Sequence, residues 1–151
     1  MPAMEFNESL KTVHFEHDQT PFELNLGWLV DFNKPHFNGR SALLAEKQRG
    51  PRYTLSKLDI EGNKPADGSY LYSEKRCTQH IGYVTSAMWS PAVKANIALA
   101  MVETEYLGGD IWAEIYYEKE LRQYSKVAHC TVKQKPFWTP VRARATPPAD
   151  Y

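Results

Sequence analysis

The chain has 151 residues, 42% of them hydrophobic, and its eighteen basic residues balance its eighteen acidic ones. This length suits one domain, or the last part of a larger enzyme, with a core of useful size. The balanced charge provides no overall field that would attract nucleic acid or an anionic membrane surface, so neither is expected as a partner.

Residues 1–19 show no steady hydrophobic period and are predicted to be a lead-in segment or a lone strand. No charged and apolar leader precedes the fold. The two cysteines, Cys77 and Cys130, lie far apart in the chain. We therefore expect reduced thiols in a cytoplasmic protein.

Two stretches carry helix signals. TPFE at residues 20–23 has a hydroxyl at the N-cap, Pro at the first position and Glu at the third, which predicts a short helix or turn that ends near Gly27. A second helix is expected over residues 40–49, stopped by GP at 50–51. Its apolar side, residues 42–45, is expected to pack on the β-barrel that follows.

From Arg52 onward the hydrophobic period changes to two, which predicts strands. About six short strands after one or two short helices indicate a mainly β fold, a small closed antiparallel β-barrel over residues 52–135, because closure removes exposed edges. The predicted strands are RYTLSKLDI (52–60), YLYSE (70–74), HIGYVTSAM (80–88), ANIALAMV (95–102), IWAEIYYEKEL (111–121) and YSKVAHCTVKQKPFW (124–138).

The most apolar run, residues 80–102, is interrupted by Ser90 and Pro91, whereas a membrane span needs roughly 20 continuous apolar residues. It is therefore predicted to be two central strands of the barrel. WSPAVKA (89–95) would connect them, since Pro91 costs no ladder hydrogen bond in a turn. Both faces of ANIALAMV are apolar, so both are expected to be covered.

The sequence gives only weak signals for a metal site or for a catalytic nucleophile. Cys77 and His80 have a ligand-like spacing, but a surface loop explains the pair better than zinc. His14, His17 and the adjacent His129 and Cys130 have no such spacing. Ser86 and Ser90 lack the Gly-x-Ser-x-Gly frame of a nucleophile elbow, so turn chemistry is the preferred interpretation.

Arg40 stands at a predicted helix start, where its charge opposes the helix dipole and therefore calls for another partner. One interpretation is an ion pair with a carboxylate such as Asp31. The other is capture of a carboxylate or a polar ring of a ligand by the planar guanidinium.

Three ordered phrases resemble the C-terminal barrel domain of the glycine cleavage T-protein (aminomethyltransferase) family. They are TPFELNLGW (20–28), FNGRSAL (37–43) and GYVTSAMWSPAVKANIALA (82–100), where Ala87 replaces the family's more usual Gly. The resemblance covers roughly residues 20–138. It divides the chain into a lead-in at 1–19, a barrel-like domain at 20–138 and a Pro-rich tail at 139–151.

The resemblance implies a barrel that closes a three-domain ring around folate in enzymes that move a one-carbon unit to N5 of tetrahydrofolate. The family's folate-binding core and catalytic Asp lie upstream of the TPFE phrase, where this chain has nineteen residues. An upstream folate-binding and catalytic domain or subunit is therefore expected as a partner, with a small methyl or aminomethyl donor as substrate. YYEKELRQYSK and the ending KPFWTPVRARATPPADY resemble the branch that demethylates methyl ethers.

The resemblance implies no catalytic residue and no metal in this chain, and the chain alone is not expected to be an active enzyme. Such chemistry needs water excluded and the donor fixed near N5. The residues expected to wall and anchor tetrahydrofolate are Trp28, Arg40, Trp89, Phe137 and Trp138. The rival hypothesis is a non-catalytic barrel that binds a partner protein or a small ligand through the same aromatic side chains.

Overall fold

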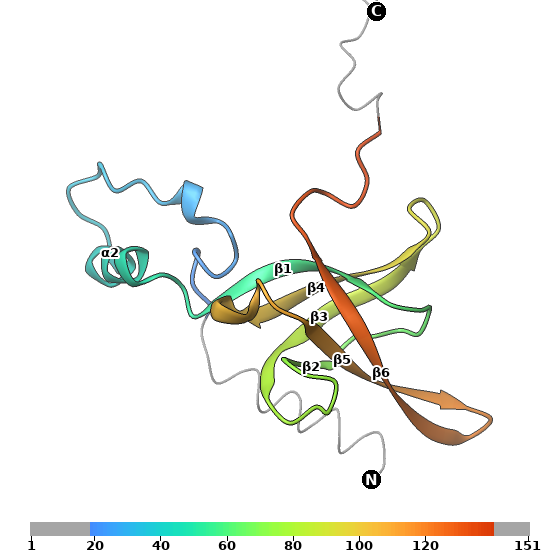
Figure 1. The fold of residues 1–151 in the computed structure, drawn as a ribbon. Coiled ribbons are helices and arrows are strands. Elements are labelled where there is room, and N and C mark those ends of the chain that lie inside the picture. Colours follow the sequence, from blue (N-terminus) through green and yellow to red (C-terminus); the bar gives the residue numbers. More distant parts are fainter. Residues whose placement is uncertain (1–18, 141–151) are drawn as a thin grey trace, which may run out of the picture.

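The structure is a computed structural model that describes residues 19–140 (Figure 1). Residues 1–18 of the predicted lead-in, with His14 and His17, and most of the Pro-rich tail lie outside the described residues. No helix in the described part is long and apolar enough to cross a membrane. The elements are η1 (Gly27–Leu29), α2 (Arg40–Arg49), β1 (Tyr53–Ile60), β2 (Tyr70–Tyr72), β3 (His80–Ser90), β4 (Ala95–Glu103), η2 (Thr104–Tyr106), β5 (Ile111–Lys119) and β6 (Arg122–Lys133).

The six strands form one closed antiparallel barrel in the order β1-β4-β3-β2-β5-β6, which confirms the predicted mainly β fold. Alternate residues of the strands point inward, as the period-two pattern requires, except in β3, where register shifts against β2 and β4 put the core residues Ile81 and Val84 three positions apart. Alanines at three inward positions of β4 and β5 leave room for the larger residues of β1, β3 and β5. The buried core consists chiefly of Leu58, Ile60, Leu71, Ile81, Val84, Ala98, Ala100, Val102, Ile111, Ala113, Ile115, Ala128 and Cys130.

Strands β3 and β4 run unusually close together at Gly82. A Cβ atom built on Gly82 would lie 2.1 Å from the carbonyl oxygen of Met101 and 3.0 Å from the Cα of Val102. Only glycine leaves space for the β4 backbone there. This physical requirement accounts for the glycine that opens the GYVTS phrase.

Two hairpins differ from the sequence prediction at their tips. Strand β3 continues to Ser90 and β4 starts at Ala95, so the connection is residues 91–94 rather than the predicted 89–95, and Trp89 is a strand residue. Pro91 occupies the turn, so it interrupts no ladder bond. Strand β6 starts two residues earlier than predicted, because Glu120 and Leu121 both take positive φ angles and make a tight two-residue turn.

Residues 19–50, which we name the arm, precede the barrel and project from it (Figure 1). Residues 21–25 form a turn. Its capping interactions are as predicted: the amide of Glu23 donates to Thr20 Oγ1 and the amide of Thr20 donates to the Glu23 carboxylate, each at 3.2 Å. The helix predicted over residues 40–49 is α2, with the same bounds.

The expectation that α2 packs on the barrel is wrong. Ala42 and Ala45 are exposed, Leu43 and Leu44 are half-buried, and the buried residue of the helix is Glu46. Figure 1 shows α2 set apart from the strands.

The arm instead builds a small aromatic cluster of its own. The rings of Phe22 and Phe32 stack with centroids 6.4 Å apart, and Phe37 packs against Phe32. The Lys47 ammonium lies 4.9 Å from the centre of the Phe32 ring. These contacts hold α2 to the rest of the arm rather than to the strands.

The arm attaches to the barrel at an edge of β1 that β6 does not reach. β6 pairs with β1 only over Lys57–Ile60. Next to the free stretch, the carbonyl of Glu23 accepts a hydrogen bond from the Leu55 amide at 2.7 Å, and Asn25 Nδ2 donates to the Leu55 carbonyl at 2.6 Å. The turn thus satisfies strand groups that would otherwise lack partners.

Candidate functional site

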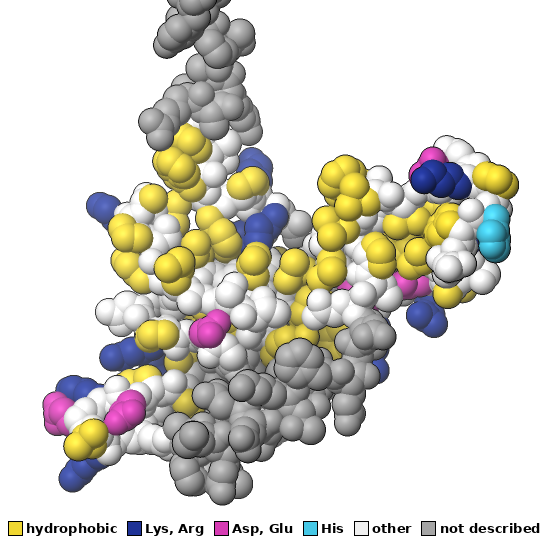
Figure 2. Space-filling view, turned by 180° about the vertical axis from the view of Figure 1, so that it is seen from behind, with side chains coloured by type: hydrophobic (Ala, Val, Ile, Leu, Met, Phe, Trp, Pro, Cys, Tyr) yellow, Lys and Arg dark blue, Asp and Glu magenta, His cyan; other side chains and the backbone are white. Residues whose placement is uncertain are grey.

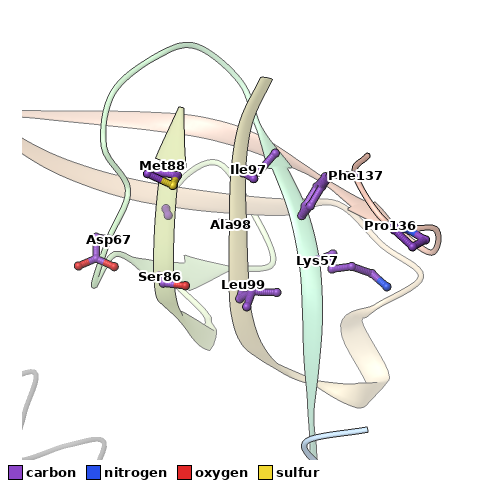
Figure 3. A pocket seen from close by; sticks show the side chains of 10 residues that line it. Lys57, Asp67, Ser86, Met88, Ile97, Ala98, Leu99, Pro136 and Phe137 are labelled. Atoms are coloured by element: carbon purple, nitrogen blue, oxygen red, sulfur yellow. The ribbon is translucent and has the colours of Figure 1, made fainter. Parts of the chain in front are cut away.

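A groove of about 600 Å³ lies on the outer face of the barrel, over β1, β4 and β3 (Figure 3). Its floor is apolar, and the segment that follows β6 contributes one side. Its lining consists of Lys57, Asp67, Ser86, Ala87, Met88, Ile97, Ala98, Leu99, Pro136 and Phe137.

The strand register explains this floor. Leu99 of β4 lies opposite Lys57 of β1 and Ser86 of β3, and the next outward residue, Ile97, lies opposite Met88. Leu99 is 40% exposed and Met88 is 66% exposed. The expectation that both faces of the ANIALAMV strand are covered is therefore wrong at Leu99, which residues 19–140 cover only in part.

The groove carries charge only at its borders. Lys57 and Asp67 lie on opposite sides of the apolar floor (Figure 3). Lys57 Nζ donates a hydrogen bond to the carbonyl of Gln134 at 3.0 Å, which ties the segment after β6 to β1. The arrangement suits an apolar or flat aromatic surface flanked by polar groups.

Arg40 holds the backbone of the arm. Its Nε donates to the carbonyl of Lys34 and its Nη2 donates to the carbonyl of Phe32, both at 3.2 Å. Asp31 instead accepts a hydrogen bond from the amide of Asn33. Within the described residues no ion pair joins Arg40 to Asp31 or to another carboxylate. These two bonds use two of the five guanidinium donors.

The five side chains predicted to line a folate cavity fall into three places. Trp28, 79% exposed, and Arg40 belong to the arm. Trp89, 46% exposed, lies near the end of β3. Phe137 lines the groove, and its neighbour Trp138 is 57% exposed. Only Phe137 therefore lines the groove itself.

A polar cluster of Tyr72, Tyr116 and Glu114 lies on the barrel surface outside the groove. The hydroxyl groups of Tyr72 and Tyr116 donate to the two carboxylate oxygens of Glu114, at 3.2 and 2.8 Å. Burial, followed by the nearby Glu114 carboxylate, raises the pKa of Tyr72, and the same causes raise the pKa of Tyr116 to about 12. Both phenols therefore stay protonated at neutral pH and act as donors.

The cysteines and histidines of the described region do not converge. Cys77 and Cys130 are free thiols, as predicted. His80 packs edge-on against Tyr70 and Tyr72. No group of three His, Cys, Asp or Glu side chains among residues 19–140 is placed to hold a metal ion.

Sequence reasoning missed the groove residues Leu99, Met88 and Lys57. The alternation of the ANIALAMV strand already placed Ile97, Leu99 and Met101 on one face. It did not reveal which face lies inside, because small alanines fill the inward positions.

The sequence and the fold both match known proteins. Residues 54–138 match the model of the glycine cleavage T-protein C-terminal barrel domain. This match covers more than half of the chain, over the strands described above. The chain belongs to this family.

Two curated relatives and one solved structure support the assignment of this chain to the T-protein family. The chain is 31% identical over 122 residues to an aminomethyltransferase of Desulforamulus reducens, and this alignment covers 80% of this chain and 31% of the relative. It is 40% identical over 90 residues to an aminomethyltransferase of Caldanaerobacter subterraneus subsp. tengcongensis, covering 59% of this chain and 23% of that protein. The crystal structure of the glycine cleavage system aminomethyltransferase T from Bartonella henselae superposes with a TM-score of 0.66 at 25% identity, covering 80% of this chain and 32% of that one.

These T-protein relatives are much longer than the part that this chain matches. The chain spans a quarter to a third of their length, at 23% and 31% for the two curated relatives and 32% for the solved structure. The family model that residues 54–138 of this chain match is that of the C-terminal barrel domain.

Proposed function

We propose that this chain is the C-terminal barrel of a tetrahydrofolate-dependent aminomethyltransferase or methyltransferase, and that it works with an upstream catalytic domain or subunit. The family match over residues 54–138 is the observation that carries the proposal. The relatives' name, aminomethyltransferase, supports a one-carbon transfer as the reaction class. Tetrahydrofolate, when bound, supplies the N5 atom that accepts the one-carbon unit.

The residues present fit one side of a folate site. The groove gives an apolar wall of Leu99, Met88 and Phe137 with one ammonium group, Lys57, at its border. A flat ring system can pack on such a wall, and a carboxylate can pair with the ammonium. The upstream domain would supply the opposite wall and the acid–base groups.

Four further side chains are proposed to face the same cavity once the upstream part closes over them: Trp28, Arg40, Trp89 and Trp138. Trp28, Trp89 and Trp138 are exposed aromatic rings that would exclude water from the reacting centre. Arg40 would anchor folate or substrate with the donors that the Phe32 and Lys34 carbonyls leave unused.

The test is transfer of a one-carbon unit to tetrahydrofolate by the upstream part of the Desulforamulus reducens relative, with and without this chain. We expect substituted folate to form only when both parts are present. Equal transfer without this chain would contradict the proposal. If the chain binds the upstream part but transfer never appears, the alternative of a non-catalytic binding module gains support.

The variant Arg40→Ala, in this reconstituted system, distinguishes a role of Arg40 in binding folate from a role in holding the arm together. An anchoring role predicts folate affinity weaker by about 1–3 kcal/mol, the usual cost of a lost hydrogen bond to a charged group. A loosened arm with unchanged folate affinity would instead assign Arg40 to the scaffold.

A further inference from the structure

The β5–β6 hairpin extends past the other strands of the barrel. β1 pairs with β6 only at Cys130–Lys133, and β2 pairs with β5 only at Trp112–Glu114. Residues 115–129 therefore form a two-stranded ribbon that no third strand among residues 19–140 joins, and Figure 1 shows it projecting at the lower right. A strand edge of this kind is a template for pairing with another chain.

The alternation of the backbone shows which residues of β6 serve its outer edge, the side away from β5. The two-residue turn closes on the pair Lys119 and Arg122, so every second residue of β6 from Arg122 onward bonds to β5. The residues between them direct their amide and carbonyl groups to the outer edge. There the Glu61 amide donates to the carbonyl of His129 at 2.9 Å. Ser125, four residues before His129, faces the same edge.

The tip of the hairpin has a costly conformation for a surface turn. Glu120 and Leu121 take φ angles of 53° and 61°, a region that Asn, Asp and Gly occupy far more readily. Leu121 is also 94% exposed. Figure 2, seen from behind, shows hydrophobic atoms among charged side chains on the projecting part at the lower left. An intermolecular contact at the tip would offset this local cost.

We propose that a second copy of this chain occupies the outer edge of β6. The β6 strands of the two copies pair antiparallel about a two-fold axis at Ser125, so that each contributes the same surface. In this register Gln123 of one copy lies opposite Val127 of the other, and Tyr124 lies opposite Lys126. The inference is independent of the proposed function, because it requires neither folate nor an upstream part.

Charge favours this register over its neighbours. A two-fold axis at Lys126 would set the two Lys126 ammonium groups directly opposite each other. An axis at Tyr124 would set Arg122 opposite Lys126. Like charges directly opposite each other destabilise a strand pair. The axis at Ser125 instead sets Arg122 opposite Ala128, so no like charges meet.

The same register gives Lys126 an aromatic partner. The rings of Tyr117 and Tyr124 stack with centroids 5.7 Å apart, and Lys64 Nζ lies 4.5 Å from the centre of the Tyr117 ring. Because Tyr117 covers the β5 side of the Tyr124 ring, the other ring face is turned to the outer edge of β6. Tyr124 is 41% exposed. Lys126 of the second copy can therefore place its ammonium over that ring face, and the two-fold axis repeats this contact.

Sedimentation equilibrium of the whole chain, with matched variants of Ser125, tests the second copy. We expect a monomer–dimer equilibrium with a Kd of roughly micromolar order for so small an interface. Ser125→Pro removes the amide donor of the outer edge but no bond to β5, and should weaken dimerisation at least about tenfold. Ser125→Ala keeps the amide and should dimerise as the wild type does. Circular dichroism checks that both variants are folded.

Disulfide cross-linking tests the register, and it decides the matter if Ser125→Pro fails to fold. Cys77→Ser first removes the more exposed native thiol. Directly opposed residues of a hydrogen-bonded antiparallel pair have Cα atoms about 5.5 Å apart, within reach of a disulfide. Ser125→Cys should therefore give a disulfide-linked dimer on mild oxidation. Gln123→Cys should not, because residue 123 lies opposite residue 127.

A wild-type chain that remains monomeric would overturn the inference, and so would a dimer that the folded Ser125→Pro variant leaves unchanged. Equal cross-linking of Ser125→Cys and Gln123→Cys would also overturn it, because the copies would then meet in another register or through another surface.

Discussion

The hydroxyl group of Thr20 donates a hydrogen bond of 2.6 Å to Oε1 of Glu46 and so joins the first turn of the arm to α2. Glu46 is 7% exposed, although it lies on a helix whose apolar residues are largely exposed or half-buried. A buried carboxylate is tolerated only when it is hydrogen-bonded. This contact therefore organises the arm, whose first turn joins the barrel at the edge of β1.

Thr20→Val is expected to loosen α2 while leaving the barrel intact. Valine has the shape of threonine but cannot donate to Glu46, and a lost bond to a charged group costs about 1–3 kcal/mol. Hydrogen exchange should show faster exchange of the Leu43 amide, which is bonded to Gly39, and no change at Leu58. Thr20→Ser is the matched control, because it keeps the hydroxyl. Unchanged exchange at Leu43 would contradict this account of the arm.

Gly82→Ala is expected to destabilise the barrel strongly. The new methyl group would meet the Met101 carbonyl oxygen at 2.1 Å, so β3 or β4 must move, at a cost of about 1–3 kcal/mol or more. Chemical denaturation measures the loss in free energy of unfolding. Gly108→Ala is the control, since no atom lies within 4 Å of its added Cβ. Equal stability of the two variants would refute the close approach of β3 and β4.

The two thiols are expected to differ in accessibility. Cys130 is buried, and burial raises its pKa to about 12, so almost no thiolate forms at neutral pH. Cys77 is only half-buried, although burial also raises its pKa. A thiol reagent should label Cys77 alone in the folded chain and both cysteines in denaturant. A denatured, unreduced chain with no titratable thiol would contradict the free thiols.

His80 is expected to make folding stability depend on pH. His80 stays exposed at the start of β3, but the loss of solvation beside Tyr70 and Tyr72 lowers its pKa below the usual 6.5, so the unfolded chain binds the proton at higher pH than the folded chain does. The contribution of His80 to the free energy of unfolding is therefore complete above the unfolded pKa. It is lost as the pH falls below about 6.5.

Denaturation of the wild type and of His80→Gln over that pH range tests this sign. The variant should lose less stability on acidification than the wild type. His36→Gln, at an exposed position of the arm, should keep the wild-type slope. An unchanged slope in His80→Gln would show that His80 does not carry this dependence.

The sequence was sufficient to predict the barrel because alternation is a local signal. The inward residues Leu58 and Ile60 of β1 and Ile111 and Ile115 of β5 stand two or four positions apart, as a half-buried strand requires. The capping pattern of Thr20 and Glu23 was equally local. The predicted bounds of α2 are confirmed as well, because the signals that start and stop this helix are also local.

The errors concern contacts between distant segments. The apolar residues of α2 gave no information on whether they meet the barrel or another domain. The ANIALAMV strand has apolar residues on both faces, and only the closed barrel shows that alanines face inward and Leu99 faces out. The groove at Leu99 and Phe137 also depends on the path of the chain after β6, which no local pattern encodes.

Titration of tetrahydrofolate into the chain alone, and into the chain mixed with the upstream part of the Desulforamulus reducens relative, tests the proposed role most directly. The groove offers one apolar wall and one ammonium group, so the chain alone should show no saturable binding, and binding in the micromolar range should require both parts. Micromolar binding by the chain alone would contradict the conclusion that this barrel is one side of a shared folate site.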